Sequence, residues 1–364
     1  MAYFSLLIKP SGPDCNLACK YCFYAGKASM FGAGKHRMDD ELLERLISDY
    51  LGLGLSPSCF AWQGGEPTLM GLEFFQKVIS LQNKYKRDGQ VVTNTLQTNG
   101  VLLDRQWCEF LHENEFLVGI SLDGPKEIHD HYRLDHGGKG TFDRVMAAIE
   151  NCRECKVEFN ILVLLNNLNV ELCDKLFDFF VGNNIRFLQF IPCLEMNEDN
   201  TAAADFAVKP EQYGEFLCRL FDRWKEYGTS KLSIRFFDSI FSYYINGRHS
   251  DCTFEPRCNS YVVVEHNGDV FCCDFFVTEK WRLGNIKDAP IEDLFNSKVK
   301  RDFARAKRDV ANQCFTCRYL SVCRGGCLKD RGINGQGYRQ PSYFCESYRQ
   351  FFDYALDELV KLIT

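Results

Sequence analysis

Up to about residue 230, short apolar runs alternate with longer stretches in which apolar residues recur every three or four positions. The short runs are typical of buried β-strands, and the longer stretches of amphipathic helices. The predicted strands cover residues 4–9, 59–63, 91–97, 117–122, 158–164 and 187–191. The predicted helices cover residues 39–51, 72–85, 104–112, 141–152, 170–180 and 210–227. This alternation predicts an α/β fold with a parallel sheet, and six units rather than eight predict a partial (β/α)6 barrel.

A different pattern begins after Leu232. Two short apolar runs, at residues 261–265 and 269–273, flank His266-Asn267-Gly268 and predict a β-hairpin. Cysteine and glycine then become frequent, and residues 348–363 predict a closing amphipathic helix. We therefore expect three parts: the barrel at 1–232, a cysteine-rich domain at 233–347, and a C-terminal helix at 348–364.

Composition narrows the class of protein. With 364 residues, 46% of them hydrophobic and 25% charged, the chain is long enough for one large core and a smaller unit. A net charge of −6 argues against a nucleic-acid partner. The N-terminus lacks the basic segment of a signal peptide, and no apolar run reaches the ~18 residues of a membrane span. We expect a cytoplasmic protein with no membrane partner.

The 19 cysteines change this picture most. A cytoplasm keeps thiols reduced, so clustered cysteines indicate metal ligands rather than disulfides. Cys15, Cys19 and Cys22 follow the first predicted strand, at the end of the sheet where α/β proteins bind ligands. Iron–sulfur clusters normally take four thiolates, so three leave one iron with open positions. The alternative is a zinc knuckle that lacks one ligand.

The Cys-x3-Cys-x2-Cys spacing, with Tyr21 before the third cysteine, resembles the radical S-adenosylmethionine superfamily. The resemblance implies that the cofactor's methionine end chelates the open iron of a [4Fe–4S] cluster and yields a 5′-deoxyadenosyl radical. Gln63-Gly64-Gly65-Glu66-Pro67 follows the second strand and matches the GGEP motif of that superfamily. The resemblance assigns cofactor contacts to Tyr21, Gly65, Glu66, Ser121, Arg133 and Leu194. Of these, Glu66 would meet the methionine ammonium, Ser121 and Arg133 its carboxylate, and Tyr21 and Leu194 the adenine.

Eight later cysteines can hold two further clusters, although a Cys-x2-Cys pair is also typical of zinc ribbons. Their spacing around the hairpin resembles the SPASM domain, which carries two auxiliary [4Fe–4S] clusters. The resemblance assigns one cluster to Cys252, Cys258, Cys273 and Cys327. It assigns the other to Cys314, Cys317, Cys323 and Cys345. The implied cofactors are S-adenosyl-L-methionine and three [4Fe–4S] clusters.

Cys272 adjoins Cys273, and neighbours in a strand point to opposite faces, so only one of them is expected to reach a cluster. The Gly-x4-Cys spacing from Gly268 selects Cys273. The eight cysteines left over are expected to be structural thiols: Cys59, Cys108, Cys152, Cys155, Cys173, Cys193, Cys218 and Cys272.

Asp274 directly follows a predicted cluster ligand, where a carboxylate could serve as a general base or could simply order the hairpin. Residues 7–354, including the Cys273-Asp274 pair and Trp281-Arg282-Leu283-Gly284-Asn285, resemble the anaerobic sulfatase-maturating enzymes. That family oxidises a Cys or Ser of an unfolded sulfatase to Cα-formylglycine without molecular oxygen. The resemblance implies Asp274 as the base, a sulfatase peptide as the substrate, and an electron donor such as flavodoxin or ferredoxin.

Three alternatives stay open at this point. The nearest is another SPASM-type peptide maturase that forms thioether or carbon–carbon crosslinks. An iron–sulfur electron carrier is a second, although a carrier needs no cluster with an open iron. A zinc-stabilised interaction scaffold is the third.

Overall fold

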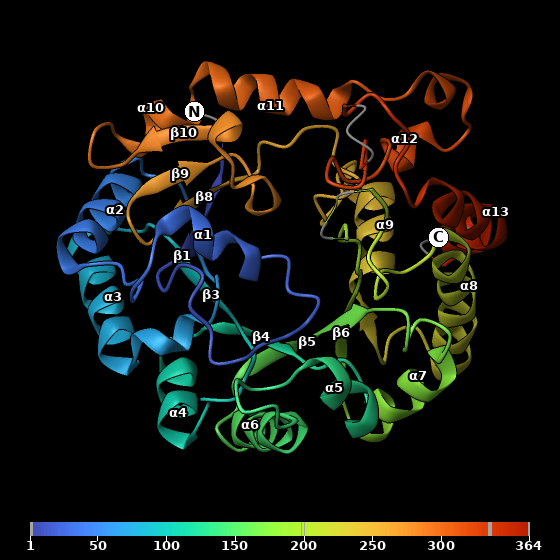
Figure 1. The fold of residues 1–364 in the computed structure, drawn as a ribbon, viewed down its shortest axis with the longest axis horizontal. Helices are drawn as coiled ribbons and strands as arrows, with labels where there is room; N and C mark the ends of the chain where they lie inside the picture. Colours follow the sequence, from blue (N-terminus) through green and yellow to red (C-terminus); the bar gives the residue numbers. More distant parts are fainter. Residues whose placement is uncertain (1–2, 198, 200, 334–336, 363–364) are drawn as a thin grey trace. The chain divides into compact units, whose positions relative to one another are not determined.

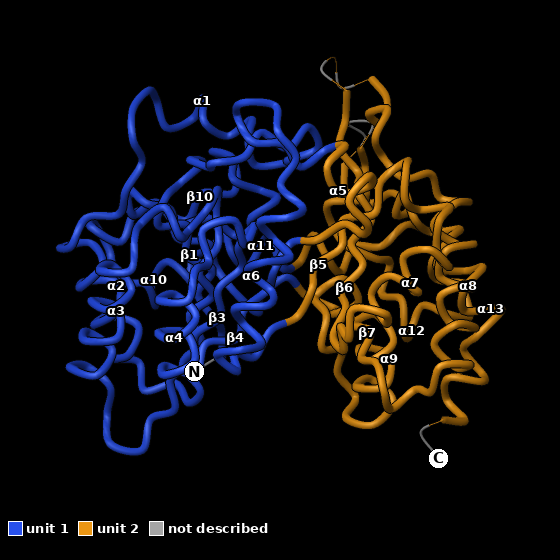
Figure 2. Tube along the Cα trace, turned by 90° about the horizontal axis from the view of Figure 1, so that it is seen from below, with its two compact units in different colours: residues 1–121, 132–159, 258–304 blue, residues 122–131, 160–257, 305–364 orange. Residues whose placement is uncertain are grey.

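The computed structural model describes residues 3–197, 199, 201–333 and 337–362 (Figure 1). The chain forms two compact units (Figure 2). The first comprises residues 1–121, 132–159 and 258–304, and the second comprises residues 122–131, 160–257 and 305–364. Each unit draws on early and late segments of the chain. Packing therefore does not divide the chain at residue 232 or 347, and the domain boundaries expected there stay a prediction.

The first unit is built on parallel strands in the predicted order. These are β1 (Ser5–Lys9), β2 (Ser58–Trp62), β3 (Val92–Thr98) and β4 (Leu117–Ser121), each paired in parallel with the next. Leu6, Phe60 and Leu96 are completely buried along these strands. The apolar runs in the sequence are thus explained by burial of side chains within this unit.

Four helices of the first unit confirm the predicted helical periodicity, with ends that match or shift by at most two residues. They are α2 (Asp40–Gly52), α3 (Leu72–Tyr85), α4 (Arg105–Glu113) and α6 (Phe142–Glu154). Asp39 caps α2 by accepting a hydrogen bond from Leu42 N at 2.8 Å, and Asp104 caps α4 by accepting one from Trp107 N at 2.9 Å. Short α1 (Ala28–Phe31) and α10 (Ile291–Phe295) were not predicted, nor was α11 (Lys298–Arg308), which continues into the second unit.

The predicted hairpin is present as β8 (Tyr261–Glu265) and β9 (Asp269–Phe271), and β8 also pairs in parallel with β1. A third strand, β10 (Arg282–Asn285), adds antiparallel to β9. The expectation that β9 reaches Cys273 was wrong. The strand ends at Phe271, and Asp274 opens a 3-10 turn, η3 (Asp274–Phe276), in which Phe276 N donates to Cys273 O. The argument from alternating strand neighbours therefore does not apply to Cys272 and Cys273.

The second unit contains β5 (Glu158–Leu165), β6 (Phe187–Pro192) and β7 (Ser233–Ile234), which pair in parallel, with the start of β5 in the first unit. Its helices include α5 (Lys126–Tyr132), α7 (Cys173–Gly182), α8 (Pro210–Tyr227), α9 (Arg235–Asn246), α12 (Leu320–Cys323) and α13 (Cys345–Lys361). The last helix begins at Cys345 rather than at residue 348. Its expected end at Ile363 lies outside the described residues.

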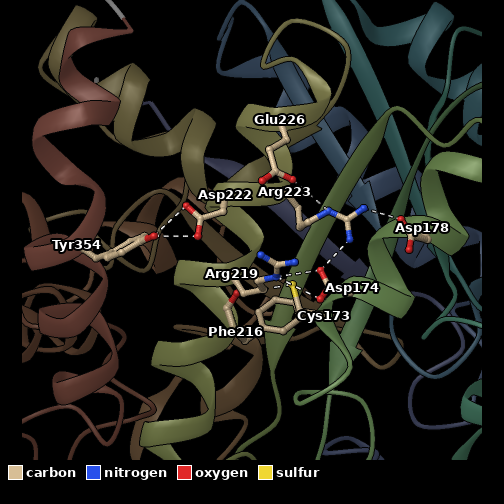
Figure 3. Close-up of polar contacts among 9 residues, drawn as sticks. All are labelled: Cys173, Asp174, Asp178, Phe216, Arg219, Asp222, Arg223, Glu226 and Tyr354. Carbon is tan, nitrogen blue, oxygen red and sulfur yellow. Dashed lines mark hydrogen bonds and ion pairs between the residues drawn. The ribbon is translucent and has the colours of Figure 1, made fainter.

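Helices α7, α8 and α13 are linked by polar contacts at the surface (Figure 3). Arg223 of α8 pairs with Asp174 at 2.7 Å and with Asp178 at 2.6 Å, and Tyr354 of α13 donates to Asp222 at 2.8 Å. Exposed ion pairs of this kind contribute only about 0–1 kcal/mol each. The union of these helices therefore depends mainly on their buried apolar faces, such as Phe221 packed against Phe351.

All six predicted strand–helix units are present, so the α/β class is confirmed. Over the part of the chain that the structure describes, β10 and β7 each pair with a single neighbouring strand, and the strands stay open as a partial barrel. Within the same residues, no helix combines the length and apolar character needed to cross a membrane.

Candidate functional site

The loop that follows β1 carries the first three cysteines. Two short turns begin it, with Gly12 N donating to Lys9 O at 3.0 Å and Asp14 N donating to Ser11 O at 3.1 Å. Asp14 is fixed further by Arg37, whose guanidinium lies 2.7 Å from its carboxylate. Cys15 directly follows these turns, so the first predicted ligand is positioned by backbone hydrogen bonds.

Cys15, Cys19 and Cys22 all lie on this loop within the first unit. Cys22 N donates to Cys19 O at 3.1 Å, and Leu17 N approaches Cys15 Sγ at 3.4 Å. Burial, reinforced by the charge of Glu66, raises the pKa of Cys15 to about 12. A thiol in that state binds metal only by losing its proton, which the positive charge of iron favours.

Gly65 packs against the backbone just before Cys15. Gly65 N donates to Gly12 O, and Glu66 N donates to Asp14 O, both at 2.8 Å. A Cβ added at Gly65 would lie 2.0 Å from Asp14 O, so only glycine fits here. At Gly65 the space that the missing side chain leaves is taken by the cysteine loop, and the predicted contact of Gly65 with the cofactor stays a prediction.

The carboxylate of Glu66 is completely buried and surrounded by donors of the protein. Thr68 Oγ1 and Thr98 Oγ1 donate to its Oε1 at 2.6 and 2.7 Å, and Asn99 N donates to its Oε2 at 2.8 Å. Burial raises the pKa of Glu66, and these hydrogen bonds oppose that effect. Glu66 therefore ties the loop after β2 to the end of β3, and a contact with a cofactor ammonium stays a prediction.

Two of the other predicted cofactor residues meet in the first unit. The guanidinium of Arg133 is buried and lies 5.5 Å from the centroid of the Tyr21 ring. Ser121 ends β4 and is half-buried. Leu194 follows β6 in the second unit and is also buried. The structure thus brings Tyr21 and Arg133 together, whereas the joint contact of all four residues with one cofactor stays a prediction.

Asp274 lies in a buried polar group that the sequence analysis did not identify. Its Oδ2 accepts a hydrogen bond from Gln63 Nε2 at 2.9 Å and lies 4.0 Å from Lys9 Nζ. Lys9 Nζ in turn lies 3.4 Å from the centroid of the Tyr24 ring. Tyr24 donates to Glu265 Oε1 at 2.5 Å. Asp274 is therefore held from one side of its carboxylate by an amide and a cation.

Lys9 and Glu265 could have been found from one signal in the sequence. Each is the charged last residue of a strand and follows three apolar residues, and the two are register partners in the β1–β8 pair. Both are completely buried. Among the described residues, neither Lys9 Nζ nor Glu265 Oε2 has a hydrogen-bond partner. Their charges are thus compensated by proximity rather than by direct hydrogen bonds between them.

The later cysteines are divided between the two units. In the second unit a cavity of about 590 Å³ is lined by one complete set of four predicted ligands: Cys314, Cys317, Cys323 and Cys345. In the first unit Tyr261 Oη lies 3.0 Å from Cys273 Sγ. Cys252 and Cys327, the remaining predicted partners of Cys258 and Cys273, belong to the second unit. Thiols around a cavity of that size fit a four-iron cluster, and the ligand sets stay a prediction.

Comparison with known proteins gives consistent results. The Radical SAM superfamily model matches residues 10–180, and the model of an iron–sulfur cluster-binding domain, SPASM, matches residues 252–318. A cysteine-type anaerobic sulfatase-maturating enzyme of Clostridium perfringens is 40% identical, covering 100% of this chain and 99% of that protein. A serine-type enzyme of Bacteroides thetaiotaomicron is 37% identical, covering 96% and 88%. The solved structure of native anSMEcpe with bound AdoMet and Cp18Cys peptide has a TM-score of 0.93 and 39% identity, covering 100% and 99%.

Proposed function

This chain belongs to the radical S-adenosylmethionine enzymes and, among them, to the anaerobic sulfatase-maturating enzymes; from this premise we propose that it oxidises a Cys or Ser of a sulfatase to Cα-formylglycine. The observation that carries the proposal is the buried carboxylate of Asp274, held by Gln63 and Lys9. The substrate is an unfolded or peptide segment of the sulfatase. A peptide is bound to the solved relative, which supports this choice.

S-Adenosyl-L-methionine and three [4Fe–4S] clusters are the cofactors in this proposal. Cys15, Cys19 and Cys22 hold the cluster that binds S-adenosyl-L-methionine, with Tyr21 and Arg133 beside it. Two sets of four cysteines hold the auxiliary clusters: Cys252, Cys258, Cys273 and Cys327, then Cys314, Cys317, Cys323 and Cys345. The support is the cysteine loop packed on Gly65, the thiol-lined cavity of the second unit, and the two matching families.

When bound, these cofactors supply a 5′-deoxyadenosyl radical that takes a hydrogen atom from the target Cβ, and an acceptor for the electron that remains. Asp274 takes the proton of the target thiol or hydroxyl. Oδ2 already accepts from Gln63 and faces Lys9, so the proton goes to Oδ1, which accepts no hydrogen bond from the described residues. Lys9 stabilises the ionised carboxylate that this step requires.

Water completes the reaction for a cysteine target. Loss of the Cβ hydrogen atom, the thiol proton and one electron leaves a thioaldehyde, which water converts to the aldehyde with release of hydrogen sulfide. A serine target gives the aldehyde directly. We also propose a low-potential electron donor such as flavodoxin or ferredoxin, because cofactor cleavage at Cys15, Cys19 and Cys22 would consume one electron each time. The clusters need reduced thiols, and a cytoplasm keeps thiols reduced. We therefore propose a cytoplasmic location.

The test is anaerobic incubation of the reconstituted enzyme with S-adenosyl-L-methionine, a reductant and a sulfatase-motif peptide carrying Cys or Ser. Formylglycine in the peptide, detected by mass spectrometry, supports the proposal. Loss of two hydrogens from a Cys peptide that keeps its sulfur and gives no aldehyde with water would instead indicate a crosslinking maturase. Deoxyadenosine without any change in the peptide would contradict the proposed substrate.

The role of Asp274 needs a separate variant. Asp274→Asn keeps the shape of the side chain and the contact with Gln63 but removes the base. We expect deoxyadenosine to form while formylglycine is lost. Asp288→Asn is the matched control, since Asp288 is an exposed carboxylate of the same region. Full turnover by Asp274→Asn would remove Asp274 from this role.

A further inference from the structure

A buried lysine on α11 has no part in the chemistry described so far. Lys300 is 3% exposed, whereas the side chain of Lys298, on the same helix, is 82% exposed. Taking an ammonium group out of water is costly unless charges or hydrogen bonds replace its hydration. The groups around Lys300 should therefore indicate the function of its positive charge.

The hydrogen-bond partners of Lys300 are two backbone carbonyl groups. Nζ donates to Tyr261 O at 2.7 Å and to Cys272 O at 2.9 Å. Both acceptors are neutral dipoles, and among the described residues no carboxylate forms an ion pair with Lys300. The carbonyls hold the ammonium in place but do not balance its charge.

The side chains that can balance the charge of Lys300 are cysteines, which become negative when they lose their protons. Burial lowers the pKa of Lys300, and the charges of Cys272, Cys273 and Cys258 oppose that effect. Cys258 and Cys273 are two of the four ligands proposed for one auxiliary cluster. Cys273 Sγ is itself 3.0 Å from Tyr261 Oη, the hydroxyl of a residue whose carbonyl binds Lys300. The ammonium is thus fixed beside two proposed ligands of the same centre.

We propose that Lys300 raises the reduction potential of the auxiliary [4Fe–4S] centre held in part by Cys258 and Cys273. The inference rests on the proposed function for the assignment of these thiolates to an iron–sulfur centre. Reduction adds one electron to a centre that is already negative, so a fixed positive charge stabilises the reduced form more than the oxidised form. The centre then accepts the electron released by the substrate more readily.

A second lysine of α11 repeats the arrangement. Lys307 is 1% exposed, and its Nζ donates to Thr253 O at 2.7 Å and also to Gly326 O. Thr253 follows Cys252 in sequence, and Gly326 precedes Cys327. Lys307 lies seven positions after Lys300, which places both on one side of the helix. Buried ammonium groups next to proposed ligands are therefore a repeated feature of α11.

The experiment is a redox titration of the reconstituted full-length enzyme, followed by electron paramagnetic resonance. Cys15→Ala, Cys19→Ala and Cys22→Ala together remove the signal of the first cluster. In this background Lys300→Gln keeps a donor for Cys272 O but removes the charge, Lys300→Arg keeps the charge, and Lys298→Gln is the exposed control. The second auxiliary centre, bound to Cys314 and its partners, serves as an internal reference.

We expect Lys300→Gln to shift one auxiliary midpoint potential to a more negative value and to leave the other unchanged, at unaltered iron content. Lys300→Arg should restore the potential, and Lys298→Gln should not change it. Equal potentials in Lys300→Gln and the unsubstituted protein would overturn the inference while leaving the proposed function intact. Absence of any auxiliary iron–sulfur signal, with zinc bound in its place, would overturn the assignment of the clusters as well.

Discussion

Lys9 Nζ lies 4.0 Å from Asp274 Oδ2, with both side chains almost completely withdrawn from solvent. Lys9 ends β1, and its register partner across the β1–β8 pair is Glu265, a second buried acid. One cation thus faces two carboxylates. Burial lowers the pKa of Lys9, and the charges of Asp274 and Glu265 oppose that effect. Lys9 is thus a buried cation whose ion-pair partner is Asp274.

Lys9→Met is therefore expected to separate cofactor cleavage from product formation. Methionine fills similar space but leaves Asp274 without its cation, which disfavours the ionised base. Formylglycine formation should fall by roughly 10²-fold or more, as for loss of a general base, while deoxyadenosine formation persists. Both products are measured by chromatography in one reaction. Lys84→Met, at an exposed ion pair with Glu44, is the control. Parallel loss of both products, or unchanged coupling, would contradict this role.

The barrel was predictable because its signal is local. Apolar periods of strands and helices can be read within 10–20 residues, and all six units lie where the pattern places them. The contact between Lys9 and Asp274 was not predictable in this way. It depends on β8 pairing with β1, and no local pattern states which distant strands will pair. The spacing of cysteines gave candidate ligands, but it did not identify the side chains that surround them.

Helix α11 was missed for a different physical reason. Its buried positions are Lys300, Phe303 and Lys307, so two of the three residues that face the interior are charged and give no apolar signal in the sequence. Asp274 shows the opposite case. Its position beside Cys273 suggested a base, but the expected strand geometry was wrong, because β9 stops at Phe271. The role of Asp274 as a base stays a prediction.

Glu265→Gln should flatten the dependence of stability on pH. Burial raises the pKa of Glu265 from 4.5 to about 7, against the opposing effects of Lys9 and Tyr24. Between these values the folded chain holds a proton that the unfolded chain has lost. The free energy of unfolding therefore falls as pH rises through this window, by up to about 3 kcal/mol.

The measurement is anaerobic thermal unfolding of the unsubstituted protein and Glu265→Gln at pH ~5 and pH ~8. Between these two pH values, the melting temperature of the unsubstituted protein should fall by more than that of Glu265→Gln. Glu73→Gln, at an exposed position, controls for the charge change alone. An equal pH dependence in Glu265→Gln and the unsubstituted protein would show that Glu265 does not carry the effect.

Gly65→Ala is expected to abolish the first cluster without removing the auxiliary ones. The new Cβ would lie 2.0 Å from Asp14 O, so the loop that carries Cys15 must move. Iron content should fall by about one third, one cluster of three, and deoxyadenosine formation should be lost. Gly26→Ala is the matched control, because a Cβ there meets nothing within 4 Å. Normal iron content and cofactor cleavage in Gly65→Ala would show that the loop after β2 and the loop that carries Cys15 need not pack so closely.

Cys314→Ala is expected to remove the cluster of the cavity in the second unit. Cys314 lines this cavity with three other proposed ligands, and a cubane that loses one of four thiolates is unstable. Iron should again fall by about one third, but deoxyadenosine should still form because the first cluster is untouched. The yield of formylglycine should decrease, since one of the two auxiliary centres that could accept the substrate's electron is lost. Cys218→Ala, on α8, should change neither iron nor product. Full iron content in Cys314→Ala would contradict the proposed ligand set. Loss of bound zinc instead of iron from this variant would contradict it as well.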